Sequence, residues 1–309
     1  MKITYSIIAP IYNEIDNLPE LYRRVKEVMD SNGEPWEFIL VDDGSTDGST
    51  EKIRDLAEKD KTIRPVIFAR NFGHQVAITA GWDYARGDAI VIIDADLQDP
   101  PEVILELTKK WKEGYEVVYA VRGEREGESW FKLWTASLFY RLIYRITDVK
   151  IPVDTGDFRL MDRKVVNVLK QMKDRHRFPR GMSAWVGFKQ IGVTYKRAAR
   201  VAGVTKYPFR KMLRLALNAI TGFSYFPLQV ATFFGFVSAG VAILAIPVVV
   251  IMRIAGSGAF FGQATTLIAV LFLGGVQLIS LGILGEYVGR LYDEAKGRPL
   301  YIVRDAPED

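Results

Sequence analysis

The sequence predicts an α/β protein: a mostly parallel sheet with helices on both faces, followed by a hairpin of two membrane-spanning helices. Two observations carry this prediction. Over residues 1–121, short apolar runs alternate with segments of helical spacing, the pattern of parallel strands joined by helices. Farther along, residues 226–252 hold no charged side chain and neither do residues 254–285, although charged residues make up 25% of the chain.

Five apolar runs predict the strands. They are Tyr5–Ala9, Phe38–Val41, Val66–Phe68, Ala89–Ile93 and Val117–Val121. Each is short and apolar, as expected for a buried strand. The first also lies in the stretch Ile3–Ile11, which is too short for a signal peptide. Because ligands of such sheets bind at the carboxyl ends of the strands, the residues just after each run are the candidates for function.

Helical spacing fills the segments between these strands. The predicted helices are residues 18–28, a segment beginning at Thr46–Ser49, Val76–Tyr84 and Val103–Trp111. In the first helix, Leu18, Leu21 and Val25 recur every three or four residues, and Asp16 or Asn17 is expected to cap it. A pair of prolines opens the last helix.

Composition limits the chemistry. The 309 residues include no cysteine, which excludes disulfides, iron–sulfur clusters and thiolate zinc sites. The two histidines, His74 and His176, are too few for a His-rich metal site, so a metal must be held by oxygen ligands. The net charge of +4 is mild and does not indicate nucleic-acid binding.

Phe226–Met252 and Ala264–Tyr287 are each long enough to cross a bilayer, which takes about 20 apolar residues in a helix. Buried core helices are the alternative, but one face of a core helix usually meets water. Basic residues gather outside the pair: Lys206, Arg210, Lys211, Arg214, Arg290, Lys296 and Arg298. The intervening loop has only Arg253, so the positive-inside rule predicts that residues 1–225 and the chain after the second span are cytoplasmic.

Polar residues follow three of the predicted strands. They are Asn13 and Glu14, Asp42 and Asp43, and then Asp94, Asp96 and Gln98. Two carboxylates on one short turn repel each other unless a cation lies between them, and Mg²⁺ or Mn²⁺ takes such oxygen ligands. Helix capping is the alternative role for these aspartates. Asp42 could likewise cap a helix, but its position also suits a hydrogen bond to a ribose or base. No G-x-G-x-x-G or G-x-x-x-x-G-K-[ST] is present, which disfavours a dinucleotide oxidoreductase.

Four motifs together resemble glycosyltransferase family 2, a family of inverting enzymes with the GT-A fold. They are APIYNE (residues 9–14), VDDGSTD (41–47), DAD (94–96) and DTGDFR (154–159). RNFGHQ (70–75), GVTKY (203–207) and the hairpin make the chain similar to the polyisoprenyl-phosphate glycosyltransferases, the group that includes dolichol-phosphate mannose synthase. Within that group it is most similar to the bacterial bactoprenol glucosyltransferases, the GtrB group. The resemblance covers the whole chain, but Q-x-x-R-W of the processive synthases is absent.

The resemblance implies a role for each matching residue. The nucleotide sugar would be bound by Pro10, Tyr12, Glu14 and Asp42, and Mg²⁺ or Mn²⁺ on its diphosphate by Asp96, Asp94 and Gln98. Asp157 holds the position of the catalytic carboxylate, with Asp94 beside the nucleotide sugar. The acceptor phosphate would be bound by Arg122, Lys206, Lys132 and Ser137, although the region after Arg122 matches loosely.

The resemblance also implies a reaction and a location. A phosphate oxygen of polyprenyl phosphate, undecaprenyl phosphate in a bacterium, attacks the anomeric carbon of a nucleotide sugar, UDP-glucose by preference. Another sugar, such as mannose or an aminosugar, and a membrane subunit that binds a nucleotide sugar without catalysis are the alternatives. A second phosphate pKa of about 6 leaves the acceptor largely dianionic, so Asp157 either takes the last proton or orients the reactants.

Four parts are therefore expected. Residues 1–200 form the cytoplasmic GT-A catalytic domain, 201–225 a basic interfacial helix, 226–288 the two spans and 289–309 a cytoplasmic tail. The interfacial helix rests on alternating apolar and basic residues over Tyr207–Phe223, for which a soluble packed helix is the alternative. The enzyme is placed in the bacterial inner membrane. The glycine-rich second span and the tail predict a homo-oligomer, with a tetramer as the working expectation.

Overall fold

The computed structural model describes residues 2–123, 155–196, 224–255 and 263–307. These residues divide into two compact units. The sheet unit contains residues 2–123, 155–196 and 298–307, and the hairpin unit contains residues 224–255 and 263–297. The chain thus leaves the sheet unit, forms the hairpin and returns to the sheet unit.

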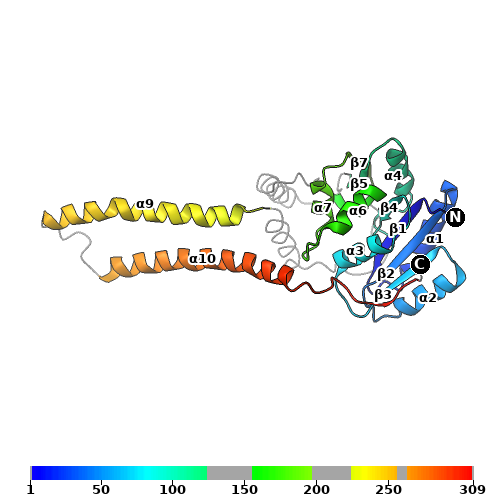
Figure 1. The fold of residues 1–309 in the computed structure, drawn as a ribbon, viewed down its shortest axis with the longest axis horizontal. Helices are drawn as coiled ribbons and strands as arrows, with labels where there is room; N and C mark the ends of the chain where they lie inside the picture. The colour runs from blue at the N-terminus through cyan, green and yellow to red at the C-terminus, as the bar shows by residue number, and fades with distance from the viewer. Residues whose placement is uncertain (1, 124–154, 197–223, 256–262, 308–309) are drawn as a thin grey trace. The chain divides into compact units, whose positions relative to one another are not determined.

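Eight strands of the described residues form one sheet in the order β7-β5-β6-β4-β1-β2-β3-β8. Figure 1 shows the fold and labels most of its helices and strands. The strands are β1 (Tyr5–Ile11), β2 (Trp36–Asp42), β3 (Ile63–Phe68), β4 (Ala89–Ile92), β5 (Val117–Arg122), β6 (Thr155–Asp162), β7 (Gln190–Tyr195) and β8 (Val303–Asp305). The neighbours β4, β1, β2 and β3 run parallel, as do β5 and β7. Only β6 and β8 pair antiparallel to their neighbours.

Helices connect most of these strands. They are α1 (Leu18–Asn32), α2 (Ser49–Lys59), α3 (His74–Tyr84), α4 (Val103–Lys112), α6 (Arg163–Gln171) and α7 (Pro179–Trp185). The first four lie where helical spacing predicts them. Asn17 occupies the N-cap position of α1, as predicted, but its side chain makes no cap hydrogen bond and its Nδ2 donates to Glu14 Oε2 at 2.6 Å.

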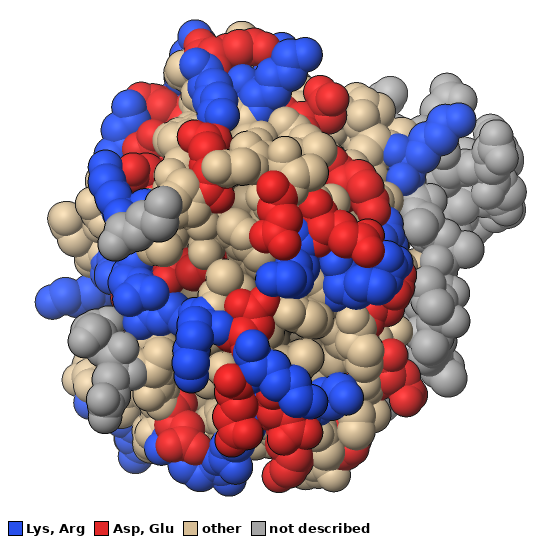
Figure 2. Space-filling view, turned by 90° about the vertical axis from the view of Figure 1, so that its right-hand side faces the viewer, with Lys and Arg blue, Asp and Glu red and all other residues tan. Residues whose placement is uncertain are grey.

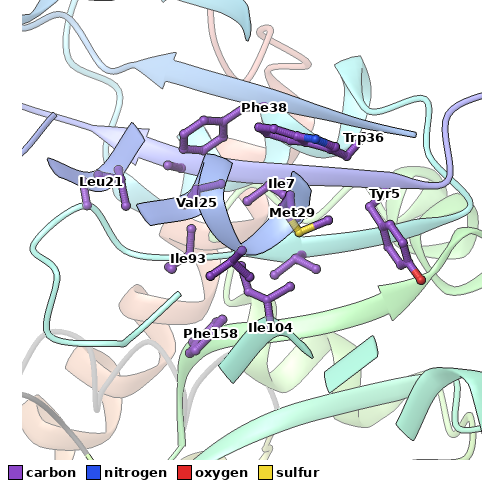
Figure 3. Packing of buried hydrophobic residues seen from close by; sticks show 14 of the residues in the cluster. Tyr5, Ile7, Leu21, Val25, Met29, Trp36, Phe38, Ile93, Ile104 and Phe158 are labelled. Atoms are coloured by element: carbon purple, nitrogen blue, oxygen red, sulfur yellow. The ribbon is translucent and has the colours of Figure 1, made fainter. Parts of the chain in front are cut away.

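Side chains of β1 alternate between two buried layers, as the period of a strand requires. Tyr5, Ile7 and Ile11 belong to the cluster that contains the buried side chains of α1 and α4, among them Val25, Met29 and Ile104 (Figure 3). Ile8 points to the other face, where its side chain packs against Gly81 of α3; a Cβ at Gly81 would come within 2.3 Å of it. Helices therefore cover both faces of the sheet, as predicted.

Three strands and two helices of the sheet unit are not predicted from the sequence. β6 and β7 contain glycine and charged or polar residues, so their apolar runs are interrupted. β8 has only three residues and becomes a strand by pairing with β3. This pairing places residues 298–307 in the sheet unit, whereas the sequence prediction has them in a separate tail.

The hairpin unit consists of α9 (Phe226–Ile254) and α10 (Gln263–Ala295). Both helices are long and apolar enough to cross a membrane, over Phe226–Met252 and Ile268–Ala295. The first span matches its prediction, and the second helix continues eight residues beyond the predicted Tyr287. The predicted interfacial helix at 207–223 lies outside the described residues.

The surface of the sheet unit carries charges of both signs side by side, as the face in Figure 2 shows. Ion pairs account for part of this mixture: Arg23 pairs with Glu20 and Glu27 along α1, and Arg24 reaches Glu102. Such exposed pairs each contribute at most about 1 kcal/mol.

Candidate active site

The carboxyl ends of β1, β2 and β4 meet at one edge of the sheet because the three strands are parallel neighbours. Ile11 pairs with Asp42 at the ends of β1 and β2, and the Ile93 amide donates to the Ile8 carbonyl at 2.9 Å. The loops after these strands, and the start of α3 that follows β3, therefore lie at one edge. This is where ligands of parallel sheets bind.

Asp157 is the best-connected carboxylate at this edge. It lies in β6, is 2% exposed, and receives Arg180 Nε on Oδ1 at 2.8 Å and Arg180 Nη2 on Oδ2 at 3.2 Å. Gln75 Nε2 donates to Oδ2 at 3.1 Å, and His74 Nε2 lies 3.4 Å from the same oxygen. Three elements, β6, α7 and the first turn of α3, thus meet on one carboxylate.

His74 lies between two carboxylates. Its Nε2 is 3.4 Å from Asp94 Oδ1 and 3.4 Å from Asp157 Oδ2. Burial lowers the pKa of His74, but the hydrogen bond to Asp157 and the charges of Asp94 and Asp157 outweigh it and raise that pKa to about 9. His74 is therefore cationic at neutral pH and links the end of β4 to β6.

The two carboxylates respond to their surroundings in opposite ways. Burial raises the pKa of Asp94; the charge of His74 opposes this and that of Asp157 adds to it. Burial also acts to raise the pKa of Asp157, but Arg180 and His74 hold it well below its usual range. Asp157 is therefore a permanently ionised group at neutral pH, whose oxygens are bonded to protein donors.

Arg122 ends β5 and lies against β6 beside Asp157. A Cβ on Gly156 would come within 2.9 Å of Arg122 Nη2, so glycine permits this approach. The buried Nε of Arg122 has no hydrogen-bond partner among the described residues. Arg159 donates to the Gly156 carbonyl at 2.9 Å, and burial lowers the pKa of Arg159 to about 10, which leaves it charged at neutral pH. Arginines thus surround the segment Gly156–Asp157.

Asp42 and Asp43 have different partners at the end of β2. Asp42 is buried and accepts the Ser45 amide at 2.9 Å and the Thr50 hydroxyl, which are contacts of a turn and a helix start. Asp43 accepts the amides of Phe72 at 2.6 Å and Gly73 at 2.9 Å, across the loop that leads to His74. Asp42 is not a helix cap, because the N-cap of α2 is Gly48 and no side chain caps this helix; Asp43 has a loop-holding role that the sequence does not reveal.

The other predicted nucleotide-sugar residues lie at the end of β1. Pro10 is a buried residue of the strand, and Tyr12 is the first side chain beyond it, 43% exposed. Glu14 accepts the Asn17 amide, and its own backbone N–H donates to Ser49 Oγ at 3.1 Å. The β1 loop is thus fixed to the β2 loop, with Tyr12 presented at the surface.

Asp94, Asp96 and Gln98 form the turn after β4. Leu97, between Asp96 and Gln98, has φ of +57°, a strained value for a buried leucine. The backbone N–H of Gln98 donates to Asp96 Oδ1 at 3.1 Å. The buried Asp94 Oδ1 has no hydrogen-bond partner among the described residues. In the described chain no three His, Cys, Asp or Glu side chains gather into a metal cage. Two carboxylates and an amide fit Mg²⁺ or Mn²⁺ that shares its shell with substrate phosphates.

The predicted site residues and the residues that the structure brings to the site are not the same set. Lys132, Ser137 and Lys206 are outside the described residues, so their predicted role stays a prediction. Gln75 and Arg180, by contrast, touch Asp157 without having been predicted. For His74 and Gln75, the RNFGHQ motif is the sequence signal that could have identified them. No pattern around Arg180 separates it from a surface arginine.

Comparison with known proteins decides the family. Residues 6–169 match the family described as Glycosyl transferase family 2. The chain belongs to glycosyltransferase family 2. An uncharacterised glycosyltransferase of Bacillus subtilis is 52% identical over 98% of this chain and 94% of its own. A bactoprenol glucosyl transferase of Shigella phage SfV is 42% identical over 99% of both chains, and a prophage homologue in Escherichia coli is 43% identical over 98% and 99%.

The sheet unit has the GT-A fold, as the family resemblance implies. Among solved structures, glucosyl-3-phosphoglycerate synthase from Mycobacterium tuberculosis, in complex with Mn²⁺, UDP-glucose and phosphoglyceric acid, is 20% identical with a TM-score of 0.48. The match covers 71% of this chain and 78% of that one.

Proposed function

We propose that this glycosyltransferase moves a hexosyl group from a nucleotide sugar to a polyprenyl phosphate, with inversion at the anomeric carbon. UDP-glucose is the leading donor and undecaprenyl phosphate the leading acceptor. The observation that carries the proposal is the similarity to bactoprenol glucosyl transferases over nearly the whole chain, including the two apolar helices. Two helices able to cross a membrane fit an acceptor that is itself a membrane lipid.

The donor would lie over the loops after β1, β2 and β4. Pro10, Tyr12, Glu14 and Asp42 are the candidates for nucleotide-sugar binding, and Tyr12 is the most accessible of them. Asp94, Asp96 and Gln98 would hold Mg²⁺ or Mn²⁺ on the diphosphate. When bound, the cation would stabilise negative charge on the leaving nucleoside diphosphate.

The acceptor phosphate needs positive charge because it must approach a second anion, the donor diphosphate. Arg122 is the candidate for that charge, since its guanidinium lies against Gly156, next to Asp157, and its buried Nε has no hydrogen-bond partner among the described residues. Lys206, Lys132 and Ser137 complete the proposed acceptor site. Charge placed in advance in this way lowers the barrier by offsetting repulsion and by orienting the nucleophile.

In the proposed step, an acceptor phosphate oxygen forms a bond to the anomeric carbon while the bond from that carbon to the diphosphate oxygen breaks. The electron pair of the broken bond leaves with the nucleoside diphosphate. One displacement inverts the centre, so an α-linked donor yields a β-linked lipid phosphate. No proton has to be removed, because the acceptor is largely dianionic.

Asp157 acts here as a fixed anion and not as a base. Its low pKa makes it a weak proton acceptor, and Arg180, Gln75 and His74 occupy its oxygens. Its role in the proposal is to hold these three side chains, and through His74 to orient Asp94. Of the two roles left open from the sequence, orientation is the one that this geometry supports.

The hairpin would keep the site at the depth of lipid headgroups on the cytoplasmic face of the inner membrane. Both termini are proposed to be cytoplasmic. Self-association remains part of the proposal, with glycines of the second span as its basis. The tail no longer supports it, because β8 pairs with β3 of its own chain.

Purified full-length protein in detergent gives the direct test. Radiolabelled UDP-glucose and undecaprenyl phosphate are incubated with Mn²⁺ or Mg²⁺, with and without EDTA, and label is counted in the organic phase. We expect EDTA-sensitive transfer into lipid, released as free glucose by mild acid. Asp157→Asn is the matched inactive variant, and Asp88→Ala, at the opposite end of β4, is the active control.

Other results separate the alternatives. Transfer from another nucleotide sugar but not from UDP-glucose would support the proposed reaction and show that the donor is a different sugar. Silence with every sugar tested, combined with intact nucleotide-sugar binding by calorimetry, would contradict catalysis and favour a binding subunit.

A further inference from the structure

The segment that returns from the hairpin to the sheet unit binds directly beside the active-site loop. We call residues Arg298–Asp305 the C-terminal strap. Its strand β8 pairs antiparallel with β3, matching Phe68 with Val303 and Ile67 with Asp305. One residue farther, the Ala69 amide donates to the Ile302 carbonyl at 2.9 Å, so the pairing continues into the start of the loop after β3.

Tyr301 extends this contact through its side chain. Its ring stacks on Phe68, with centroids 5.1 Å apart and planes at 16°, and Phe68 in turn meets the edge of Phe72 at 5.6 Å. The Tyr301 hydroxyl donates to Asp83 Oδ2 at 2.7 Å, near the end of α3. A single residue of the strap therefore contacts β3 and the last turn of α3, and reaches the intervening loop through Phe68.

The segment held in this way carries the contacts of the site. The amides of Phe72 and Gly73 are bound by Asp43, and the next two residues, His74 and Gln75, reach Asp157. His74 also reaches Asp94. Loop residues at such a junction stay in place only if both ends are fixed, and β3 and α3 are those ends.

We propose that Tyr301 is a positioning residue for catalysis: the C-terminal strap holds the loop 69–73 so that His74 and Gln75 meet Asp157. The kinetic part of this inference rests on the proposed glycosyl transfer, whereas its structural part does not. Covering the edge of a sheet requires only the backbone pairing of β8, and the stacked ring and the bond to Asp83 go beyond that.

Hydrogen exchange of the full-length protein in detergent, without substrate, tests the structural part. Tyr301→Ala removes the ring, Tyr301→Phe removes only the hydroxyl, and Ile302→Ala changes the neighbouring side chain, which is 54% exposed, while keeping its carbonyl. In Tyr301→Ala we expect amide exchange over residues 69–75 to accelerate about tenfold, with α1 unchanged. Tyr301→Phe should restore most of the protection, and Ile302→Ala should match the wild type.

To test the kinetic part, the rate of sugar transfer is divided by the concentration of nucleotide-binding sites, so that a loss of folded protein does not lower the measured kcat. We expect kcat of Tyr301→Ala to fall about tenfold at an unchanged KM for the lipid phosphate, because small displacements of catalytic groups cost at least that much. Unchanged exchange over 69–75 in Tyr301→Ala would overturn the proposal. If the wild type transfers no sugar, the exchange data still decide the role of the strap, and only the proposed function fails.

Discussion

His74, Arg180 and Asp157 illustrate how charge is arranged around one buried carboxylate. A single buried anion would be costly, and here two cations and an amide donor surround it. The arrangement fixes three side chains from two helices relative to β6. Its rigidity suits a reaction in which two anions must be oriented and no proton must move.

The ion pair of Arg180 with Asp157 predicts the first outcome. Arg180→Met leaves Asp157 buried with fewer donors, and breaking such a pair costs about 3–5 kcal/mol when it is fully buried. Because Arg180 keeps 28% of its side chain exposed, we expect a smaller loss of stability, together with a kcat reduced by about 100-fold. Arg180→Lys should recover part of the activity, since it restores charge but not the paired hydrogen bonds.

The control for this variant is Arg23→Met on α1, which removes an equally charged but exposed arginine. Activity in a lipid-extraction assay and melting by tryptophan fluorescence are measured together. Equal effects of the two variants on kcat would contradict the role of Arg180.

His74 predicts a dependence of stability on pH. Its pKa is about 9 in the folded protein and 6.5 in the reference state, so folding favours the protonated form. The stabilisation is complete below pH 6.5 and is lost as the pH rises through 9. In EDTA, the melting temperature of the wild type should therefore fall more between pH 6.5 and 9.5 than that of His74→Gln. Parallel curves for the two proteins would contradict a cationic His74.

Asp96 predicts the dependence on metal. Asp96→Ala should lower kcat at least about 100-fold and abolish the effect of Mn²⁺ on nucleotide-sugar affinity, because a carboxylate ligand is lost. Asp88→Ala, which changes the aspartate directly before β4, is the matched control. Full activity of Asp96→Ala would remove the metal assignment.

At the level of elements, Gly44 fixes the contact between two active-site loops. It has φ of +70°, and a Cβ would come within 2.5 Å of the Arg70 carbonyl carbon. Gly33, at the end of α1, has a similar φ of +74° but no atom within 4 Å of a Cβ. Substituting each glycine by alanine therefore distinguishes the cost of backbone strain, present at both positions, from the cost of steric overlap, present only at Gly44.

Gly33→Ala should cost about 1 kcal/mol, the strain of a left-handed backbone alone. Gly44→Ala should cost clearly more and should weaken nucleotide-sugar binding, since the Asp43 and Phe72 loops must move apart. Denaturant melts and calorimetric titration with UDP measure the two effects. Equal losses in both variants would show that the loops do not need this close approach.

The elements that sequence patterns predict are those with uninterrupted apolar character. β1, β2 and β4 are buried throughout, and each begins and ends within two residues of its predicted bounds. β6 is not predicted from the sequence because its site residues, Gly156 and Asp157, interrupt the apolar pattern of a strand. The motif residues Asp94 and Asp157 can be foreseen, whereas Arg180 and Tyr301 act through contacts between distant segments that no local pattern encodes.

For the whole molecule, the distribution of basic residues predicts the topology. A reporter that is active only in the periplasm should be active when inserted between the spans, within residues 256–262, and inactive when fused after Asp309. A cytoplasmic reporter should give the reverse result. Periplasmic activity of the fusion after Asp309 would contradict a two-span hairpin.

The sheet unit is built from chain on both sides of the hairpin, since β8 follows α10. On the ribosome, β8 is made after both apolar helices, so the edge of β3 stays unpaired while the hairpin is being inserted. Completion of the sheet must therefore follow translation of the hairpin. A nascent chain stopped before residue 298 should contain folded β1, β2 and β4 but an unsecured active-site loop, so the enzyme should become active only after the hairpin has been made.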